Sequence, residues 1–483
     1  MNFSTKILLI TTALLLGACS SNDGPTGVTD PVEPPPTDFA MLQALNASPD
    51  GPNINVIVGA TAIVSDMDFM GGTAEGAGPP GSQMISVEAV IPGVDDDGDP
   101  LTEEIILPAA YDLALDTVTT VVVTGLDGAQ VLSVFVQDKT DDDGDFVAVS
   151  AGAARVFVVH ADADAAVGAV DVYIVAPNAD LAASAPLAAA LVFEGSSTPT
   201  EFAAGAWELV VTGAGVPGDV IYNQFISLLD GDDLTMAIVP DASGFGLIQV
   251  VAMDGAGATT IYDIITPALL SIDHLSPNAG TVDANSDVPV DPTTLVAGMV
   301  YQDSNGGDIE PGPHTVSFDS VALGTLASAD VAGAAGSYDA IIFDGTQVSI
   351  GGLFELEATV FTESNRPVSS YAKARLYFAS YSILDVDVYF VALPVTEITG
   401  LDADIEAGAF RDMTGYEPVD AGDYTIFVTE ANDGESPIIP IFSQAVTLAN
   451  GGVYTLIISD DDLTGLTFGL TIREDNIFLA GGP

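Results

Sequence analysis

The chain has 483 residues, 48% of them hydrophobic, which is enough for roughly two to five domains with buried cores. It carries 69 acidic residues against 8 lysines and arginines, a formal net charge of −61. Such a surface repels nucleic acid and anionic lipid and attracts cations or basic proteins, which excludes nucleic-acid binding.

Residues 1–18 have the pattern of a secretory signal peptide. Lys6 precedes an apolar run from Ile7 to Leu16, and small residues lead up to Cys19, the only cysteine of the chain. The run is shorter than the ~20 residues of a membrane-spanning helix. Leu16-Gly17-Ala18-Cys19 resembles a bacterial lipobox, in which the cysteine is lipidated and becomes the new N-terminus. We therefore expect Cys19 to be the lipid attachment site that ties the protein to a membrane.

The residues after the cysteine indicate the location and a spacer. Ser20 resembles the pattern of lipoproteins sorted to the outer membrane, without indicating the periplasmic or the surface face. Residues 19–38 are rich in Pro, Asp and Gly and offer almost nothing to bury, so we expect an extended tether. No segment of the remaining chain is a long uninterrupted apolar run, and we expect it to be soluble.

Internal repeats divide the remaining chain. Arg155-Val156-Phe157-Val158-Val159-His160 followed by Val170-Asp171-Val172-Tyr173 recurs as Arg375-Leu376-Tyr377-Phe378 followed by Val386-Asp387-Val388-Tyr389, with looser copies at Leu42 and Leu269. A second repeated feature lies later in each copy. It is a glycine followed by a strand of alternating pattern, at Gly81, Gly205, Gly312 and Gly422. The repeats predict four modules of normal domain size, at 39–152, 153–266, 267–371 and 372–483.

Within each copy the apolar residues alternate. Val170, Val172 and Ile174 point one way, and Asp171 and Tyr173 the other, which predicts half-buried strands with one face in the core and one in solvent. Clusters of Gly, Asp, Asn and Pro separate the runs, as is typical of an all-β sandwich. The Ala-rich stretch from Leu181 to Ala190 is compatible with a helical turn and does not change the class.

The repeats resemble the bacterial domain-of-unknown-function family 4397, whose hallmark is a V-H-A-S-P-D-A-P stretch followed by V-D-V-Y. The second copy has Val159-His160-Ala161 but Asp162-Ala163-Asp164 in place of Ser-Pro-Asp, and the first has Asn46 in place of the histidine. The third copy has His274, and the fourth retains only the V-D-V-Y end. The resemblance implies tandem immunoglobulin-like antiparallel β-sandwich domains in a cell-envelope setting, and it implies no activity.

The histidines are the first candidates for chemistry. His160 and His274 share a repeat position that holds Asn46 in the first copy and Ala379 in the fourth. A position that accepts these residues is typical of a strand-end hydrogen bonder, and neither these histidines nor His314 has an indicated partner for general acid–base work. There is no G-x-S-x-G, H-E-x-x-H or Walker A motif, and Cys19 serves as the anchor. We expect no enzyme activity and no cofactor.

Two near-identical acidic loops, Asp95-Asp96-Asp97-Gly98-Asp99 and Asp141-Asp142-Asp143-Gly144-Asp145, are the candidates for metal binding. Clustered carboxylates around a Gly turn suit calcium, although the spacing does not fit an EF-hand. In a chain this acidic, solvated turns are the competing interpretation, and a calcium site stays an open alternative.

Five aromatic residues lie at equivalent strand positions, where packing is favoured over ligand stacking: Trp207, Tyr173, Tyr389, Tyr424 and Tyr454. Besides the membrane, we expect one further partner, an envelope or extracellular protein or glycan whose identity the sequence does not indicate. The leading hypothesis is a lipid-anchored, non-enzymatic surface or periplasmic binding or adhesion protein. The alternatives are a structural stalk stabilised by calcium and, third, an envelope hydrolase.

Overall fold

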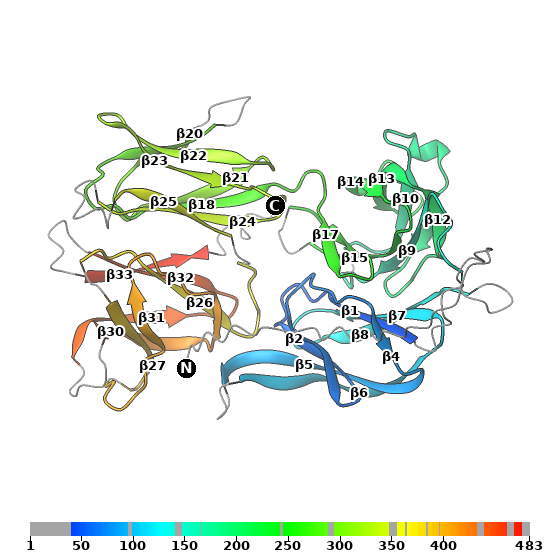
Figure 1. The fold of residues 1–483 in the computed structure, drawn as a ribbon, viewed down its shortest axis with the longest axis horizontal. Coiled ribbons are helices and arrows are strands. Elements are labelled where there is room, and N and C mark those ends of the chain that lie inside the picture. Colours follow the sequence, from blue (N-terminus) through cyan, green and yellow to red (C-terminus); the bar gives the residue numbers. More distant parts are fainter. Residues whose placement is uncertain are drawn as a thin grey trace, which may run out of the picture.

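The computed structural model describes residues 40–94, 99–140, 147–164, 166–241, 245–287, 294–346, 355–362, 365–382, 385–395, 397–431, 439–460 and 468–475. Their regular structure is β-strand throughout, apart from one 3₁₀ turn, η1 (Leu181–Ala183), in the Ala-rich stretch (Figure 1). The all-β prediction is confirmed.

Four consecutive stretches of chain form sandwiches of one topology, which we call modules 1 to 4. Module 1 contains β1 (Ala40–Asn46), β2 (Ile54–Val58), β3 (Thr61–Met67), β4 (Gly76–Gly78), β5 (Gly81–Val94), β6 (Pro100–Leu113), β7 (Thr117–Thr124) and β8 (Val131–Asp138). Module 2 contains β9 (Ala153–His160), β10 (Val170–Val175), β11 (Ala188–Leu191), β12 (Thr200–Ala203), β13 (Gly205–Gly213), β14 (Val220–Leu228), β15 (Asp233–Pro240), β16 (Ile248–Met253) and β17 (Ala258–Ile261).

The second half of the chain repeats the arrangement. Module 3 contains β18 (Ala268–His274), β19 (Val282–Ser286), β20 (Thr294–Met299), β21 (Ser304–Ile309), β22 (His314–Ser320), β23 (Gly324–Val331), β24 (Tyr338–Asp344) and β25 (Glu357–Thr362). Module 4 contains β26 (Ala372–Phe378), β27 (Asp385–Ala392), β28 (Ile405–Ala409), β29 (Glu417–Val419), β30 (Gly422–Glu430), β31 (Pro440–Leu448), β32 (Val453–Asp460) and β33 (Phe468–Glu474).

Each module pairs two sheets with the same strand order. The first sheets run β4-β1-β7-β8, β12-β9-β15-β16-β17, β21-β18-β24-β25 and β29-β26-β32-β33. The second sheets run β3-β2-β5-β6, β11-β10-β13-β14, β20-β19-β22-β23 and β28-β27-β30-β31. Neighbouring strands are antiparallel except for one parallel pair in each first sheet: β1 with β7, β9 with β15, β18 with β24 and β26 with β32.

A separate apolar core lies between the two sheets of each module. In module 2, Val170, Val172 and Ile174 pack with Leu209 and Met236, among others. The corresponding clusters of the other modules are centred on β2 and β7, β18 and β22, and β26 and β30. Alternation thus predicted the core face of these strands correctly.

The expectation that the opposite face of these strands lies in solvent is wrong. Tyr173 is only 2% exposed and packs with Val175 and Val210 in a second, smaller cluster. Tyr389 is likewise buried, against Ile398 and Phe427. Connecting loops cover this face, which the alternation of single strands does not reveal.

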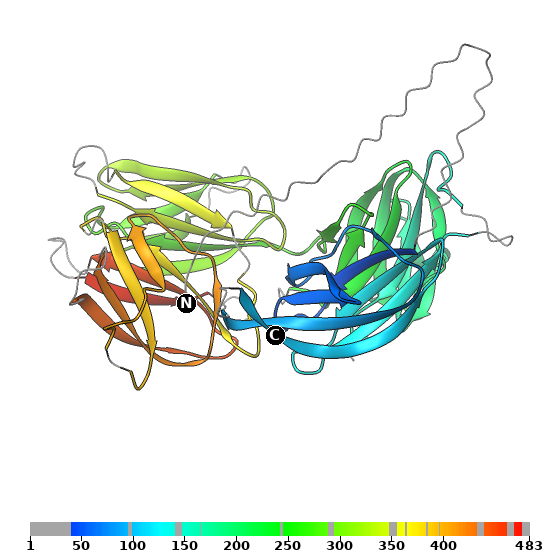
Figure 2. The ribbon, with the colours of Figure 1, turned by 60° about the horizontal axis from the view of Figure 1, so that its bottom comes forward.

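The modules pack against one another in pairs (Figures 1 and 2). The outer faces of the first sheets of modules 1 and 2 meet in an apolar cluster that includes Leu45, Phe135, Phe157 and Val251. Modules 3 and 4 meet in the same way through Leu275, Ile342, Tyr377 and Ile457. Because both faces of these sheets are covered, strands such as β7, β24 and β32 are buried along their whole length.

A long hairpin joins the two pairs of modules. Strands β5 and β6 have 14 residues each and extend from module 1 toward module 4 (Figures 1 and 2). We call this hairpin the arm. Its far end contacts β29 of module 4, so the two pairs lie side by side. Among the described residues, none forms a helix long and apolar enough to cross a membrane.

Candidate functional site

The two histidines at the shared repeat position are held in the same way. The Nδ1 atom of His160 accepts a hydrogen bond from the backbone N–H of Asp162 (3.3 Å), and its Nε2 lies 3.1 Å from the carbonyl oxygen of Gly168. His274 repeats both contacts, with Ser276 N–H at 3.3 Å and Gly280 O at 2.8 Å. Because an N–H only donates, Nδ1 must accept, and Nε2 therefore carries the proton of a neutral ring.

Burial lowers the pKa of both His160 and His274, which favours this neutral form further. In module 1, Asn46 makes the corresponding pair of hydrogen bonds. Its Oδ1 accepts from Ser48 N–H (3.1 Å), and its Nδ2 donates to the carbonyl of Met67 (3.1 Å). In module 4 the position is Ala379, which packs into the interface with module 3. The geometry therefore agrees with a strand-end hydrogen bonder.

The second residue of the V-D-V-Y motif, an aspartate in modules 2 to 4 and Asn55 in module 1, also has a structural task. In each module this side chain accepts a hydrogen bond from a residue with positive φ on the neighbouring edge strand. The pairs are Asn55 with Asp66, Asp171 with Ala190, Asp283 with Gly298, and Asp387 with Ala407. The strand register shifts beside each of these contacts. The motif thus fixes a β-bulge in which one backbone N–H would otherwise lack a partner.

The Gly-led strands share a third contact. The side chain two residues after the glycine donates to, or in the case of His314 lies at hydrogen-bond distance from, a backbone carbonyl four residues earlier. The pairs are Gln83 with Pro79, Trp207 with Ala203, His314 with Glu310, and Tyr424 with Asp420, at 2.6 to 3.2 Å. Trp207 also packs edge-on against Phe202. These aromatic residues therefore contribute to structure, as the packing hypothesis holds.

Other sequence candidates lie outside the described residues. Cys19 and the tether fall there, as do residues 95–98 of the first acidic loop and all of the second, 141–145. No group of three or more potential metal-binding side chains is found in the part of the chain that is described. Calcium binding by the acidic loops stays a hypothesis.

The basic residues form a pattern that the sequence did not reveal. Seven of the 8 are described, and all lie at or beside the junctions between modules, none with an exposed side chain: Lys139, Arg155, Arg366, Lys373, Arg375, Arg411 and Arg473. Lys139 of module 1, for example, pairs with Asp233 of module 2 at 3.0 Å. The described basic charge therefore faces carboxylates inside the assembly, and the exposed charge is acidic.

The junction of modules 3 and 4 contains a buried ionic network. Arg473 of module 4 pairs with Asp273 of module 3 and with Asp475, and all three side chains are less than 10% exposed. Thr455 links the network to Arg375, whose Nε lies 2.8 Å from the threonine hydroxyl. Burial raises the pKa of Asp273, although Arg473 opposes the shift.

Arg411 of module 4 forms a second set of ion pairs across this junction. Its Nε donates to Asp344 of module 3 at 2.8 Å, and it also pairs with Glu357. Tyr377 of module 4 donates to the same Asp344.

Arg366 links the two pairs of modules, and we call Arg366 and its contacts in module 1 the clamp. Arg366 belongs to the segment between β25 and β26, and its guanidinium donates to Asp68 of module 1 (2.6 Å) and to the carbonyls of Pro49 (3.2 Å) and Gly51 (2.7 Å). Nearby, Ser369 donates to Asp50 at 2.7 Å. The Arg366 guanidinium is the main opposite charge beside Asp68, and it holds the pKa of that carboxyl below its ordinary value although burial acts to raise it.

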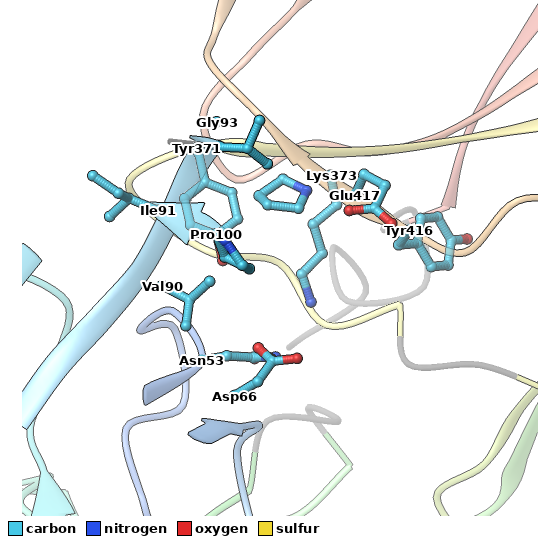
Figure 3. Close-up of a pocket in the computed structure, with 12 residues that line it drawn as sticks. Asn53, Asp66, Val90, Ile91, Gly93, Pro100, Tyr371, Lys373, Tyr416 and Glu417 are labelled. Atoms are coloured by element: carbon cyan, nitrogen blue, oxygen red, sulfur yellow. The ribbon is translucent and has the colours of Figure 1, made fainter. Parts of the chain in front are cut away.

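A cavity of about 260 Å³ lies beside this clamp, between module 1 and module 4 (Figure 3). Module 1 contributes Asn53 and Asp66 and the apolar end of the arm. Module 4 contributes Lys373 from β26 and Glu417 from β29. The side chain of Lys373 extends across the cavity toward Asn53 and Asp66. This is the candidate binding site of the molecule.

Burial shifts the pKa values of two charged residues of the cavity. Burial, with a contribution from Arg366, lowers the pKa of Lys373 to about 8. Burial also raises the pKa of Glu417, and Asp66 adds to that shift. The sequence could not indicate this site, because its residues come from two modules whose contributions lie more than 270 positions apart and belong to no motif. The scarcity of basic residues was the one available signal.

Comparison with curated proteins finds no match for the chain. Among solved structures, 13 chains match, one of them described as the Bacillus anthracis TIE protein. That alignment has 9% sequence identity and a TM-score of 0.13, and covers 87% of this chain and 68% of that chain. A TM-score of this size does not establish a shared fold.

Residues 40–173 match the family model of DUF4397, which is described as a domain of unknown function. The match spans module 1, β9 and the part of β10 up to Tyr173, and includes both His160 and Asp171. Residues 40–173 are thus identified with DUF4397, the family that the repeat motifs resemble.

Proposed function

We propose that this protein is a lipid-anchored component of a bacterial outer membrane that works by binding and catalyses no reaction. The observation that carries the proposal is the polar cavity between modules 1 and 4, which the clamp and the arm position. The histidines and aspartates of the family motif are engaged in holding turns and bulges, which leaves them structural rather than chemical roles.

The packing of the modules supports binding over a stalk. A stalk gains length when its domains follow one another end to end. Here the modules pair face to face, and the pairs are joined by Arg366 and the arm. An acidic exterior anchored through Cys19 and a tether would present this assembly to an envelope or extracellular protein or glycan.

The anchor can be tested by replacing its attachment residue. In Cys19→Ala, metabolic labelling with a fatty acid should disappear and the protein should leave the membrane fraction. Unchanged labelling and fractionation would refute lipid anchoring at this cysteine.

The binding function is tested in cells. A deletion strain should lose adhesion or retention of an envelope partner, and the wild-type chain should restore it. Unchanged adhesion, partner recovery and envelope integrity in the deletion strain would refute the proposal. A purified protein that turns over any substrate in a hydrolase panel would refute its non-enzymatic part.

A further inference from the structure

The cavity between modules 1 and 4 combines hydrogen-bonding groups of both kinds with an apolar wall. Asp66 and Glu417 offer carboxylate oxygens, Lys373 offers N–H donors, and Asn53 offers both. Val90, Ile91 and Pro100, from the arm, supply the apolar side (Figure 3). Binding sites for small molecules typically join such a wall to a few convergent polar groups.

The orientation of Lys373 indicates that its donors are available to a ligand. The ion pairs that described residues make with Lys139, Arg155, Arg366, Arg411 and Arg473 do not include Lys373. Its side chain points into the cavity toward Asp66, whose Oδ1 accepts from Asn53 Nδ2 at 3.0 Å. An ammonium group in this position can donate to a guest while Asp66 and Glu417 accept from it.

The charged groups that line the cavity narrow the class of ligand. The lining has two carboxylates and one ammonium, in a chain with a net charge of −61, so it disfavours anions. A cation would meet the Lys373 ammonium directly. A neutral molecule with several hydroxyls avoids both conflicts, because each hydroxyl can donate to a carboxylate and accept from the ammonium or amide.

The size fits such a guest. At roughly 30 Å³ of liquid volume per water molecule, a cavity of about 260 Å³ holds about nine waters, which exceeds the bulk of one sugar ring. The apolar arm can then cover the C–H face of the ring while the polar groups take its hydroxyls.

We propose that this cavity binds a neutral polyhydroxylated ligand, a single sugar unit or the end of a glycan, with Lys373, Asp66, Asn53 and Glu417 as its polar contacts. The inference rests on the proposed binding function and names its ligand class. The arm closes one side of the site, so the site depends on modules 1 and 4 being held together.

The experiment uses the full-length lipoprotein in neutral detergent micelles. Glucose, galactose, N-acetylglucosamine and maltose are titrated by ligand-observed NMR and calorimetry, with acetate, glycine and ethanolamine as charged probes. We expect saturable binding of at least one sugar, with an affinity that changes less than twofold between low and high salt, because the ligand is neutral. Preference for a charged probe would overturn the ligand class.

Three variants locate the site. Lys373→Ala and Glu417→Gln should each weaken sugar binding at least tenfold, and Ile91→Trp should block it by filling the cavity. Glu103→Gln, an exposed change on β6, should bind like the wild type. Thermal melting checks folding, and the near-isosteric Glu417→Gln keeps the test valid if Lys373→Ala unfolds.

The outcomes separate the two proposals. Sugar binding that survives all three variants, or no sugar binding by folded protein, overturns the cavity assignment. If a strain carrying Ile91→Trp adheres normally while the deletion strain does not, the binding function stands and the cavity proposal fails.

Discussion

At the scale of single residues, the polar members of the family motif stabilise local turns. His160 and His274 each join a strand end to a loop through two backbone contacts, and Asn46 forms the corresponding pair of hydrogen bonds in module 1. An asparagine side chain can imitate the ring because it too offers one acceptor and one donor at similar spacing. The chemistry required at this position is hydrogen bonding by a neutral side chain.

Replacement of His160 tests this conclusion. His160→Ala should lower the free energy of unfolding of module 2 by about 1–3 kcal/mol, because buried backbone groups lose their partners. His160→Asn should retain most of the stability, as Asn46 does in module 1. Chemical denaturation measures both, and equal losses in the two variants would contradict the hydrogen-bonding role.

Asp162 is a second residue with a measurable effect. It stands where the family motif has serine, it is 1% exposed, and its Oδ2 has no hydrogen-bond partner in the described part of the chain. Burial raises the pKa of Asp162 to about 6. The folded state therefore binds the proton more tightly than the unfolded state, so this residue's contribution to stability is lost as the pH rises from about 4 through 6.

We predict that Asp162→Ser stabilises the protein at pH 7 by about 2 kcal/mol, since it removes a charge that burial disfavours. The gain should shrink as the pH falls through 6 and vanish near pH 3, below the ordinary pKa of 3.8, where the wild-type carboxyl is protonated in both states. Thermal melting across this pH range measures it. The exposed Glu103→Gln controls for the general loss of one negative charge, and an equal gain at both pH values would contradict the prediction.

At the scale of elements, each module depends on a bulge at the edge of its second sheet. Asp171 receives hydrogen bonds from Ala190 N–H (2.7 Å) and Gly215 N–H (2.8 Å). Ala190 has a φ of 48°, in the left-handed region that ordinary residues avoid. The aspartate side chain compensates for this local strain, which explains why the same motif recurs at the start of β10 and β27.

Asp171→Ala should therefore cost about 2–3 kcal/mol, because two backbone donors lose a charged acceptor. Asp171→Asn should cost less, as module 1 uses Asn55 for one such contact. Hydrogen exchange should show faster exchange of the Ala190 and Gly215 amides in the alanine variant. Unchanged protection of these amides would refute the role.

At the scale of the whole molecule, the few basic residues determine how the modules assemble. In a chain of net charge −61, repulsion opposes any approach of two modules. Pairing Arg366, Arg411 and Arg473 with carboxylates of another module offsets this repulsion at the points of contact. The buried pair of Arg473 and Asp273 in particular favours one arrangement, because any other leaves buried charges without partners.

Arg473→Met tests this at the junction of modules 3 and 4. It leaves Asp273 and Asp475 buried without their cation, and should cost about 3–5 kcal/mol. Small-angle scattering should show a larger radius of gyration as the junction opens. Adding Asp273→Asn should recover part of the loss, and the absence of any recovery would contradict the coupling of these two residues.

The sequence predicted the β-class and the core faces, because alternation and turn residues are local properties. It also placed His160 and His274 at one structural position, since their repeats could be compared with Asn46. It failed for Tyr173 and Tyr389, whose outer faces are covered by loops that no strand pattern describes.

Sequence alone determined the repeated sandwich, since the strands of each module pair with strands of the same module and their alternation and turn residues are local properties of the chain. Tertiary structure alone decided where the basic side chains lie and where the cavity forms. Lys373 and Asp66 are far apart in sequence, and only the docking of module 1 on module 4 brings them together. That docking depends on charges paired across modules, and such pairs leave no periodic signal in the chain.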